Sequence, residues 1–189
     1  DATPEQTVTE VDLTGDLTVY AVWSETPSTP TTGKTVSIRS GADGVNGIRF
    51  SATVNARTKA ALEEYGFIVA LEDTVGDGEL TFNTKNDTTG APLYVTGTAY
   101  SKSKGIDCQY DVSPTGVTTF TAVCVGIPST AHATRMVVRP YAVFTNNGLK
   151  TTFYGTAVKS SLIEAAQAVR DAGGEAYEAN KEYIDGILG

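Results

Sequence analysis

The turn Asn146-Asn147-Gly148 and its two flanking segments constrain the fold of this chain more than any other feature. Residues 136–145 and 149–158 are rich in β-branched and aromatic side chains, which favour strands. An Asn-Gly pair between two such segments is typical of a tight type I′ connection, in which both central residues have positive φ. The sequence therefore predicts an antiparallel hairpin over residues 136–158.

Other segments extend this β pattern. Ile48, Phe50, Ala52 and Val54 occupy every second position, which places them on one face of a strand. Further strands are expected at residues 36–38, 65–71, 80–82, 93–100, 106–112 and 117–125. One or two helical turns are expected at residues 56–64, with Asn55 as N-cap. Seven to nine strands with frequent turns predict a mainly β chain, an antiparallel β-sandwich that is Ig-like or jelly-roll-like.

The C-terminal part changes to a helical pattern. Ser161 and Glu164 have the spacing of a capping box. They precede an apolar stripe at helical spacing, Leu162, Ala165, Ala166 and Val169. Gly173-Gly174 ends this helix, and residues 175–185 resume helical spacing. The sequence predicts a short C-terminal helical segment that packs on a sheet.

The N-terminal part divides into two pieces. Residues 17–23 alternate as a strand does, and residues 26–33 contain only Thr, Pro, Ser and Gly. Such a composition favours an extended, solvated linker. We therefore expect a strand-bearing piece at 1–25, a linker at 26–34 and the main domain at 35–189.

Charge limits the partners of the chain. Its formal net charge is −8, and no Lys/Arg cluster reverses this locally. Phosphate backbones and anionic bilayers are therefore unfavourable partners. No segment of 18 apolar residues exists to span a membrane, and the excised domain is expected to be monomeric. The chain opens Asp1-Ala2-Thr3-Pro4, so an export signal is expected to have been cleaved or to lie upstream.

The two cysteines fall on either side of a predicted turn. If the hairpin centres near Gly116, Cys108 lies directly opposite Cys124. Opposed Cβ atoms are about 4.5–5.5 Å apart, close to the roughly 3.5–4.5 Å of a disulfide. A Cys108–Cys124 disulfide is the favoured interpretation, and two reduced, buried thiols are the alternative.

Motifs for catalysis are sparse. His132 is the only histidine, and no Gly-x-Ser-x-Gly nucleophile turn accompanies it. The acidic pairs Glu63-Glu64 and Glu72-Asp73 are read as solvated carboxylates rather than a glycosidase pair. Glycine-rich phosphate and dinucleotide loops are also missing from the sequence. The sequence predicts a protein that is not an enzyme and has no catalytic residues.

A calcium site is the one cofactor that the sequence suggests. Asp73, Asp77 and Glu79 gather three carboxylates among glycines, and calcium takes six to eight oxygen ligands. The spacing differs from that of an EF-hand loop. An acidic turn without metal is the alternative interpretation.

Tyrosines offer a second kind of binding site. Tyr94, Tyr100, Tyr141 and Tyr154 are candidates for stacking on the rings of a glycan. Tyr141 and Tyr154 fall roughly opposite each other on the hairpin at 136–158. Because cross-strand aromatic pairs commonly stabilise a sheet, a purely structural role is the alternative.

Two resemblances complete the sequence analysis. Residues 15–23, Gly-Asp-Leu-Thr-Val-Tyr-Ala-Val-Trp, resemble the closing strand of a Listeria–Bacteroides type repeat of bacterial surface proteins. Residues 47–50, 64–69, 139–144 and 153–155 resemble an accessory domain of exported proteins of gut Firmicutes. This likeness spans about residues 47–170 and carries over no site residues.

The resemblances imply an extracellular or cell-surface location and a place in a multidomain bacterial protein, with residues 1–25 as the remnant of an upstream repeat. The function they imply is that of a non-catalytic module acting as a structural spacer or an adhesion domain. A carbohydrate-binding module that uses surface tyrosines is the alternative. A glycan or a surface protein is the expected partner.

Overall fold

The computed structural model describes residues 29–32, 36–55, 62–75, 79–85, 106–112, 117–146 and 148–189. Their strands are β1 (Thr31–Thr32), β2 (Ser37–Arg39), β3 (Gly47–Asn55), β4 (Leu62–Leu71), β5 (Ile106–Val112), β6 (Val117–Val125), β7 (Met136–Asn146), β8 (Leu149–Tyr154) and β9 (Val158–Ser160). Their helices are α1 (Glu72–Val75), the 3-10 turn η2 (Ser129–Ala131), α2 (Leu162–Ala172), α3 (Gly174–Glu178) and α4 (Lys181–Leu188).

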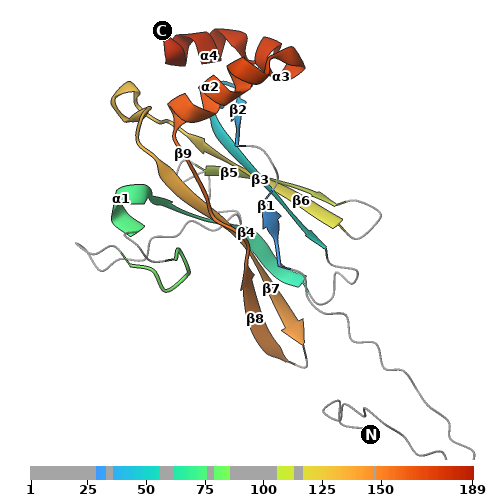
Figure 1. Cartoon of the computed structure of the whole chain (residues 1–189). Coiled ribbons are helices and arrows are strands. Elements are labelled where there is room, and N and C mark those ends of the chain that lie inside the picture. The colour runs from blue at the N-terminus through green and yellow to red at the C-terminus, as the bar shows by residue number, and fades with distance from the viewer. Residues whose placement is uncertain are drawn as a thin grey trace, which may run out of the picture.

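The strands form two antiparallel sheets, as Figure 1 shows. In the first sheet β1 and β2 both pair with β3, which is followed by β6 and β5. In the second sheet β7 lies at the centre, with β4 on one side and β8 and β9 as its other partners. The chain is therefore mainly β and sandwich-like with a C-terminal helical segment, as the sequence predicted.

The main core lies between the two sheets. Ile48, Phe50, Ala52 and Val54 of β3 are all buried, which confirms the predicted alternation. Across from them the Phe120 ring of β6 lies 5.3 Å from the ring of Tyr65 and 5.0 Å from the ring of Phe67, both on β4. Aromatic side chains dominate the energetics of such cores because each buries a large apolar area.

Three short helices close one end of the sandwich, at the top of Figure 1. Both hydrogen bonds of the Ser161 capping box are present: the Ser161 hydroxyl accepts from the Glu164 amide, and the Glu164 carboxylate accepts from the Ser161 amide. The predicted apolar stripe of α2 is buried. The predicted helix at 175–185 is divided into α3 and α4 at Ala179-Asn180. The Asn180 side chain donates a hydrogen bond to the carbonyl of Ala176 and accepts hydrogen bonds from the amide and hydroxyl of Ser40. These bonds attach the junction between α3 and α4 to the loop after β2.

The helical turns predicted for residues 56–64 are wrong at Leu62–Glu64. These residues begin β4 and pair with β7, with an irregularity between Leu62 and Glu64. The Glu64 carboxylate accepts a hydrogen bond of 2.5 Å from the Tyr141 hydroxyl. Sheet pairing and this contact outweigh the local helix propensity. Residues 56–61 lie outside the described residues.

A second, smaller core covers the other face of the second sheet. It joins Ile68 and Tyr141 to Leu80, with Phe82 packed against it. Residues 80–82, predicted as a short strand, run into a turn instead. Their apolar side chains are used to cover the sheet rather than to extend it. The strand predicted at 93–100 lies outside the described residues.

The hairpin that the Asn-Gly turn predicts is confirmed. Asn146 pairs with Leu149, which leaves a two-residue loop, and Gly148 has φ +80°. A glycine adopts this left-handed conformation without the steric cost that a side chain brings. The register also places Tyr141 opposite Tyr154, as expected.

Candidate functional site

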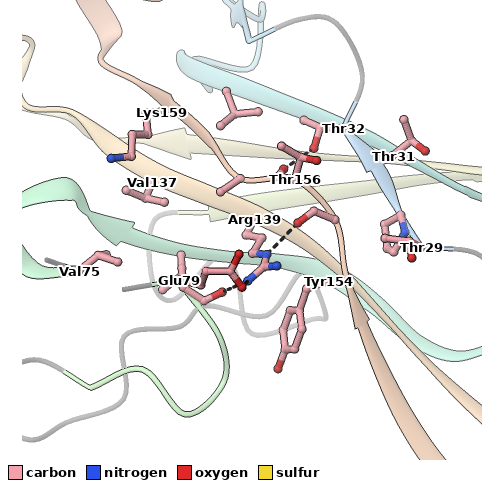
Figure 2. A pocket seen from close by; sticks show the side chains of 15 residues that line it. Thr29, Thr31, Thr32, Val75, Glu79, Val137, Arg139, Tyr154, Thr156 and Lys159 are labelled. Atoms are coloured by element: carbon pink, nitrogen blue, oxygen red, sulfur yellow. Dashed lines mark hydrogen bonds and ion pairs between the residues drawn. The ribbon is translucent and has the colours of Figure 1, made fainter. Parts of the chain in front are cut away.

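The first candidate site is a cleft of about 680 Å³ beside β1, β7 and the connection between β8 and β9. Figure 2 shows the side chains that line it. The lining combines hydroxyl, charged and aromatic groups, among them Thr32, Thr156, Glu79, Arg139 and Tyr154. Such side chains could bind a ligand or could hold parts of the fold together. The hydrogen-bond partners of each polar group distinguish these two roles.

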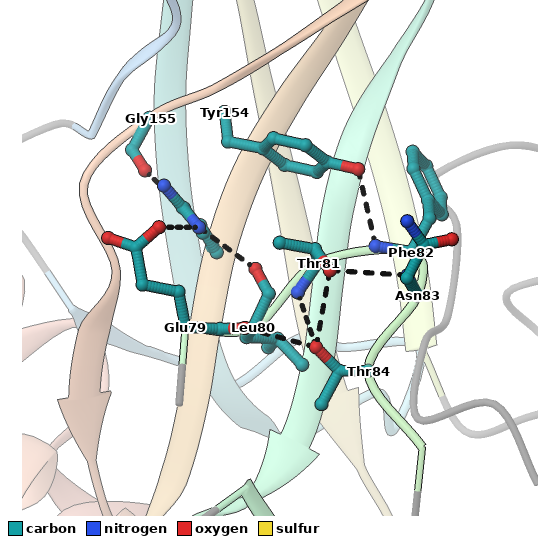
Figure 3. Close-up of polar contacts among 9 residues, drawn as sticks. Glu79, Leu80, Thr81, Phe82, Asn83, Thr84, Tyr154 and Gly155 are labelled. Carbon is teal, nitrogen blue, oxygen red and sulfur yellow. Dashed lines mark hydrogen bonds and ion pairs between the residues drawn. The ribbon is translucent and has the colours of Figure 1, made fainter. Parts of the chain in front are cut away.

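Arg139 of β7 is the best-connected group in the cleft, and its side chain is 12 % exposed. Its Nε donates to the carbonyl of Gly155 at 2.7 Å, and its Nη1 donates to the carbonyl of Leu80 at 3.1 Å. The same Nη1 lies 3.1 Å from Oε2 of Glu79. The guanidinium carbon lies 5.0 Å from the centre of the Tyr154 ring, within cation–π range. Figure 3 shows the hydrogen bonds and the ion pair that involve Glu79, Leu80 and Gly155. Arg139 therefore joins three separate segments of the chain.

Pro140 explains why the predicted strand at 149–158 is interrupted. The amide of Gly155 donates to the Pro140 carbonyl at 2.8 Å. In an antiparallel ladder the N–H and C=O of one residue face the same neighbour, and proline has no N–H to give. The partner strand therefore stops at Tyr154 and resumes as β9 at Val158.

The chain segment before β2 fits into this interruption. A Cβ atom built on Gly155 would lie 2.3 Å from the carbonyl oxygen of Pro30 and 2.8 Å from Cγ of Pro140. Thr32 Oγ1 donates to the carbonyl of Thr156 at 2.7 Å, and Pro30 is fully buried. Gly155 is therefore the residue that lets the N-terminal segment reach the second sheet.

These contacts concern part of the predicted linker at 26–34. Thr31 and Thr32 pair with Thr53 and Ala52 of β3, and Pro30 is buried, so these residues lie against the first sheet although Thr31 stays exposed. The physical reason is that proline and threonine fit an edge strand as readily as a linker. Residues 1–28 lie outside the described residues, so the repeat remnant and the first part of the linker stay predictions.

The predicted glycan-stacking tyrosines have different outcomes. Tyr141 has no exposed surface; it packs edge-on against Phe82 and donates to Glu64. Its predicted stacking role is therefore wrong, because the ring is part of the core. Tyr154 is half-buried in the cleft, where its hydroxyl accepts from the amide of Phe82 at 3.2 Å. Tyr94 and Tyr100 lie outside the described residues.

The residues of the predicted calcium site have different surroundings in the structure. Asp73 lies exposed on α1, and the Glu79 carboxylate pairs with Arg139. Asp77 lies outside the described residues. In the part of the chain that the structure describes, no three His, Cys, Asp or Glu side chains gather in a group that could hold a metal ion. The calcium site stays a prediction, and Arg139 competes for one of its three carboxylates.

The cysteine register differs from the predicted one by two residues. Cys108 pairs with Ala122, and Cys124 pairs with Ile106 on one side and Ile48 on the other. The direct opposition on which the predicted disulfide rested is therefore wrong, because Val112 pairs with Thr118 and this register is not symmetric about position 116. Cys124 is a free thiol, and burial raises its pKa.

We expect Cys124 to react slowly with iodoacetamide in the folded protein at mildly alkaline pH. The thiolate is the reactive form, and a raised pKa reduces its population. Peptide mapping after timed alkylation measures the rate at each cysteine, with the urea-unfolded chain as control. Equal rates at Cys124 in folded and unfolded protein would contradict the burial of this thiol. Intact mass with and without reductant tests the Cys108–Cys124 bridge itself.

A group of charged side chains ties α1, β9, α2 and the residue before β7 together. Glu72 pairs with Lys159 at 2.8 Å and with Arg135 at 3.1 Å, and Arg135 also reaches Glu164 at 3.2 Å. The hydrogen bond from Lys159 and then the charge of Arg135 hold the pKa of Glu72 below its ordinary value of 4.5. This carboxylate therefore stays ionised further into the acid range than a free glutamate.

The lowered pKa of Glu72 predicts a specific acid sensitivity. Its contribution to stability is complete above its ordinary pKa of 4.5 and is lost as the pH falls through the lowered folded value. Glu72→Gln should therefore reduce the drop in melting temperature below pH 4.5 relative to wild type. The acid limb of thermal unfolding measures this, with Glu175→Gln, an exposed residue of α3, as control. Parallel acid limbs for wild type and Glu72→Gln would contradict the prediction.

The second candidate site is a cleft of about 760 Å³ between the helices and the loop after β2. His132, Glu178, Asn180 and Glu182 help to line it. Asn180 is engaged with Ser40, and the His132 carbonyl accepts from Ile163 at 3.1 Å. His132, the histidine singled out in the sequence, thus lies at the foot of the helical cap, and its described hydrogen bonds run through its backbone, to the Ser129 carbonyl and from the Ile163 amide.

Of the predicted acidic pairs, Glu72-Asp73 lies on α1, where Glu72 is occupied by cations. Glu64 accepts from Tyr141, and the side chain of Glu63 lies outside the described part. Among the described side chains, Glu64 and Glu72 are therefore each engaged by other residues of the chain. The residues that matter most in the first cleft, Arg139 and Gly155, were not candidates in the sequence analysis. A proline inside a central strand and a glycine near its partner were the available signals.

Comparison of the chain with protein-family models, with curated proteins and with solved structures gave no match. Within the described residues, no helix has both the length and the apolar character needed to cross a membrane.

Proposed function

We propose that this chain is a non-catalytic module of a bacterial cell-surface or secreted protein, acting as a structural spacer or adhesion domain. The observation that carries the proposal is that the arginine of the first cleft bonds to the chain itself. Arg139 donates to the carbonyls of Gly155 and Leu80 and to the carboxylate of Glu79. Nε and Nη1 are thus held by internal partners that fasten the fold, and Nη2 is the part of the guanidinium left for a substrate.

The path of the chain supports a spacer. Pro30–Thr32 enter the sandwich beside β3 and the interruption after β8, whereas Gly189 lies in the helical cap at the top of Figure 1. Both parts are tied into the fold by hydrogen bonds, at Thr32 and at Asn180. Modules fastened near both ends can be strung in series, as in the multidomain surface proteins that the sequence resembles.

A carbohydrate-binding module is the second candidate, and one described tyrosine still favours it. Tyr154 lies in a cleft with the hydroxyls of Thr31, Thr32 and Thr156. An aromatic face beside hydroxyl groups suits a sugar ring, whose C–H face is apolar and whose rim is polar. This version depends on how much of the ring remains free beside Arg139 and Phe82.

The test is a panel of plant, host and bacterial glycans, read for binding and for hydrolysis, with and without calcium. A spacer gives neither, and an adhesion or carbohydrate-binding module gives binding without release of reducing ends. Binding through Tyr154 would be lost in Tyr154→Ala and retained in Tyr177→Ala, a partly exposed tyrosine of α3. Reproducible hydrolysis of any glycan by the wild-type chain would overturn the proposal.

A further inference from the structure

The helices α3 and α4 form a small C-terminal unit that is joined to α2 through two glycines. Gly173 and Gly174 have φ +63° and +70°, and Gly173 caps the end of α2. Within α3, all of which the structure describes, no side chain is buried, and Ile184 is the buried side chain of α4. In α2, by contrast, four apolar side chains are buried. Because burial of apolar surface is the main favourable term in packing, the C-terminal unit is attached less firmly than α2.

The C-terminal unit has internal contacts of its own. The Tyr177 hydroxyl donates to Oδ1 of Asp185 at 2.9 Å, and Nζ of Lys181 lies 5.6 Å from the centre of the Tyr177 ring. Its polar attachment to the sandwich is at Asn180, which accepts from the amide and hydroxyl of Ser40. A cleft of about 760 Å³ lies between the unit and the loop after β2, so the two surfaces touch over only part of their extent. We therefore expect α3 and α4 to open as one piece about the glycine pair.

The N-terminal strands are attached in a different way. β1 and β2 lie one after the other along the same edge of β3, and both are antiparallel to it. β1 pairs with Ala52 and Thr53, and β2 pairs with residues 47–49. At about 3.3 Å per residue, the edge from Gly47 to Thr53 is roughly 20 Å long. The chain therefore enters at the Thr53 end of this edge and reaches the helical cap at the Gly47 end, as Figure 1 shows.

Tension between the two ends of the domain loads these two attachments differently. A pull on Pro30 acts along the edge of β3, so the backbone hydrogen bonds of β1 and β2 resist it together. The bond from Thr32 to the Thr156 carbonyl and the close fit of Pro30 against Gly155 add to this resistance.

A pull on Gly189 acts first on the last turn of α4, which lies across the end of the sandwich in Figure 1. The contacts of α4 are then loaded one turn after another. Contacts loaded in sequence open at lower force than contacts loaded together, because each bears the whole tension in its turn. Forced opening depends on the rate of opening rather than on equilibrium stability alone. The C-terminal unit is therefore the first part of the described chain to yield.

We infer that the C-terminal unit is an extensible joint, which detaches and unravels at low tension while the sandwich stays folded. Residues 174–189 supply a first extension of at most about 50–60 Å when fully stretched. The edge formed by β1, β2 and β3 then carries the load until the sandwich itself opens at a higher force. The inference rests on the spacer form of the proposed function, in which neighbouring modules pull on both ends of this one.

The experiment is single-molecule force spectroscopy on the full chain, with a handle at each end. We expect two steps in wild type: a lengthening of at most about 50–60 Å that reverses when the force is lowered, and then rupture of the sandwich at a higher force. Ile184→Ala should raise the rate of the first step at constant force at least about tenfold, because it removes the buried anchor of α4. It should leave the second step unchanged.

Thr32→Val should have the opposite pattern. It keeps the shape of the side chain but removes the bond to the Thr156 carbonyl. We expect the rate of the second step at constant force to rise about fivefold, the usual worth of one hydrogen bond, while the first step keeps its wild-type rate. The two variants thus separate the C-terminal attachment from the N-terminal one.

Ile163→Ala is the matched control for Ile184→Ala, because it removes the same atoms from the exposed side of α2, where Ile163 is 37 % exposed. A single rupture in wild type, an equally faster first step in Ile163→Ala, or a first step altered by Thr32→Val would overturn the inference. If Ile184→Ala does not fold, Asn180→Ala removes the bonds to Ser40 instead, and an unchanged first step in that variant would overturn it. Each of these results leaves the proposed spacer intact, whereas hydrolysis of a glycan overturns the proposed function separately.

Discussion

Replacement of Phe120 by alanine is expected to lower the free energy of unfolding by about 3–5 kcal/mol, the usual cost of truncating a core aromatic residue. Phe120 is 1 % exposed and extends from the first sheet to the Tyr65 and Phe67 rings of the second. Its loss removes burial and two aromatic contacts at once and leaves a cavity between the sheets. A loss of this size is a large share of the stability of a typical domain.

Urea unfolding followed by circular dichroism measures this change. Leu149→Ala is the matched control, because Leu149 is 71 % exposed at the start of β8 and loses a side chain of similar character. We expect Leu149→Ala to stay within about 0.5 kcal/mol of wild type. Similar midpoints for the two variants would show that Phe120 does not join the sheets in the way described.

Replacement of Gly155 by alanine is the second change with a large expected effect, about 1–3 kcal/mol or more from overpacking. The added Cβ would lie 2.3 Å from the Pro30 carbonyl, a backbone atom that cannot rotate away. We expect Pro30–Thr32 to be displaced from the edge of the first sheet. The bond from Thr32 Oγ1 to the Thr156 carbonyl should be lost with them.

Gly186→Ala provides the comparison for Gly155→Ala. A Cβ on Gly186 of α4 meets nothing within 4 Å, so alanine there should be neutral or stabilising by about 0.5–1 kcal/mol. Urea midpoints compare the two variants, and limited proteolysis near Thr31 detects a displaced N-terminal segment. A Gly155→Ala protein as stable and as resistant as wild type would refute the close approach of Pro30.

The parts of the fold that the sequence predicted are those with local causes. The Asn-Gly turn, the alternation of β3 and the Ser161 capping box each depend on residues close together in the chain. Leu62–Glu64 had a helical pattern, yet their pairing with β7 makes them a strand. That pairing joins residues far apart in sequence, which local propensity does not encode.

The candidate site was harder to predict for the same reason. Tyr141 and Tyr154 were placed opposite each other correctly, but only packing against Phe82 and Glu64 decides that Tyr141 is buried. The cysteine register depended on a turn whose centre the sequence did not fix, and the actual pairing is displaced by two residues. The role of Arg139 depends on carbonyls from two separate segments, Gly155 and Leu80.

The central claim is that Arg139 fastens the fold rather than binding a ligand, and Arg139→Met tests it most directly. Methionine keeps much of the apolar stem but removes the donors to the Gly155 and Leu80 carbonyls. The control is Lys159→Met, which lines the same cleft with a half-exposed side chain. The measurement is the urea unfolding midpoint of each variant. The account predicts a loss of about 2–3 kcal/mol for Arg139→Met and at most about 1 kcal/mol for Lys159→Met. Wild-type stability in Arg139→Met would contradict it.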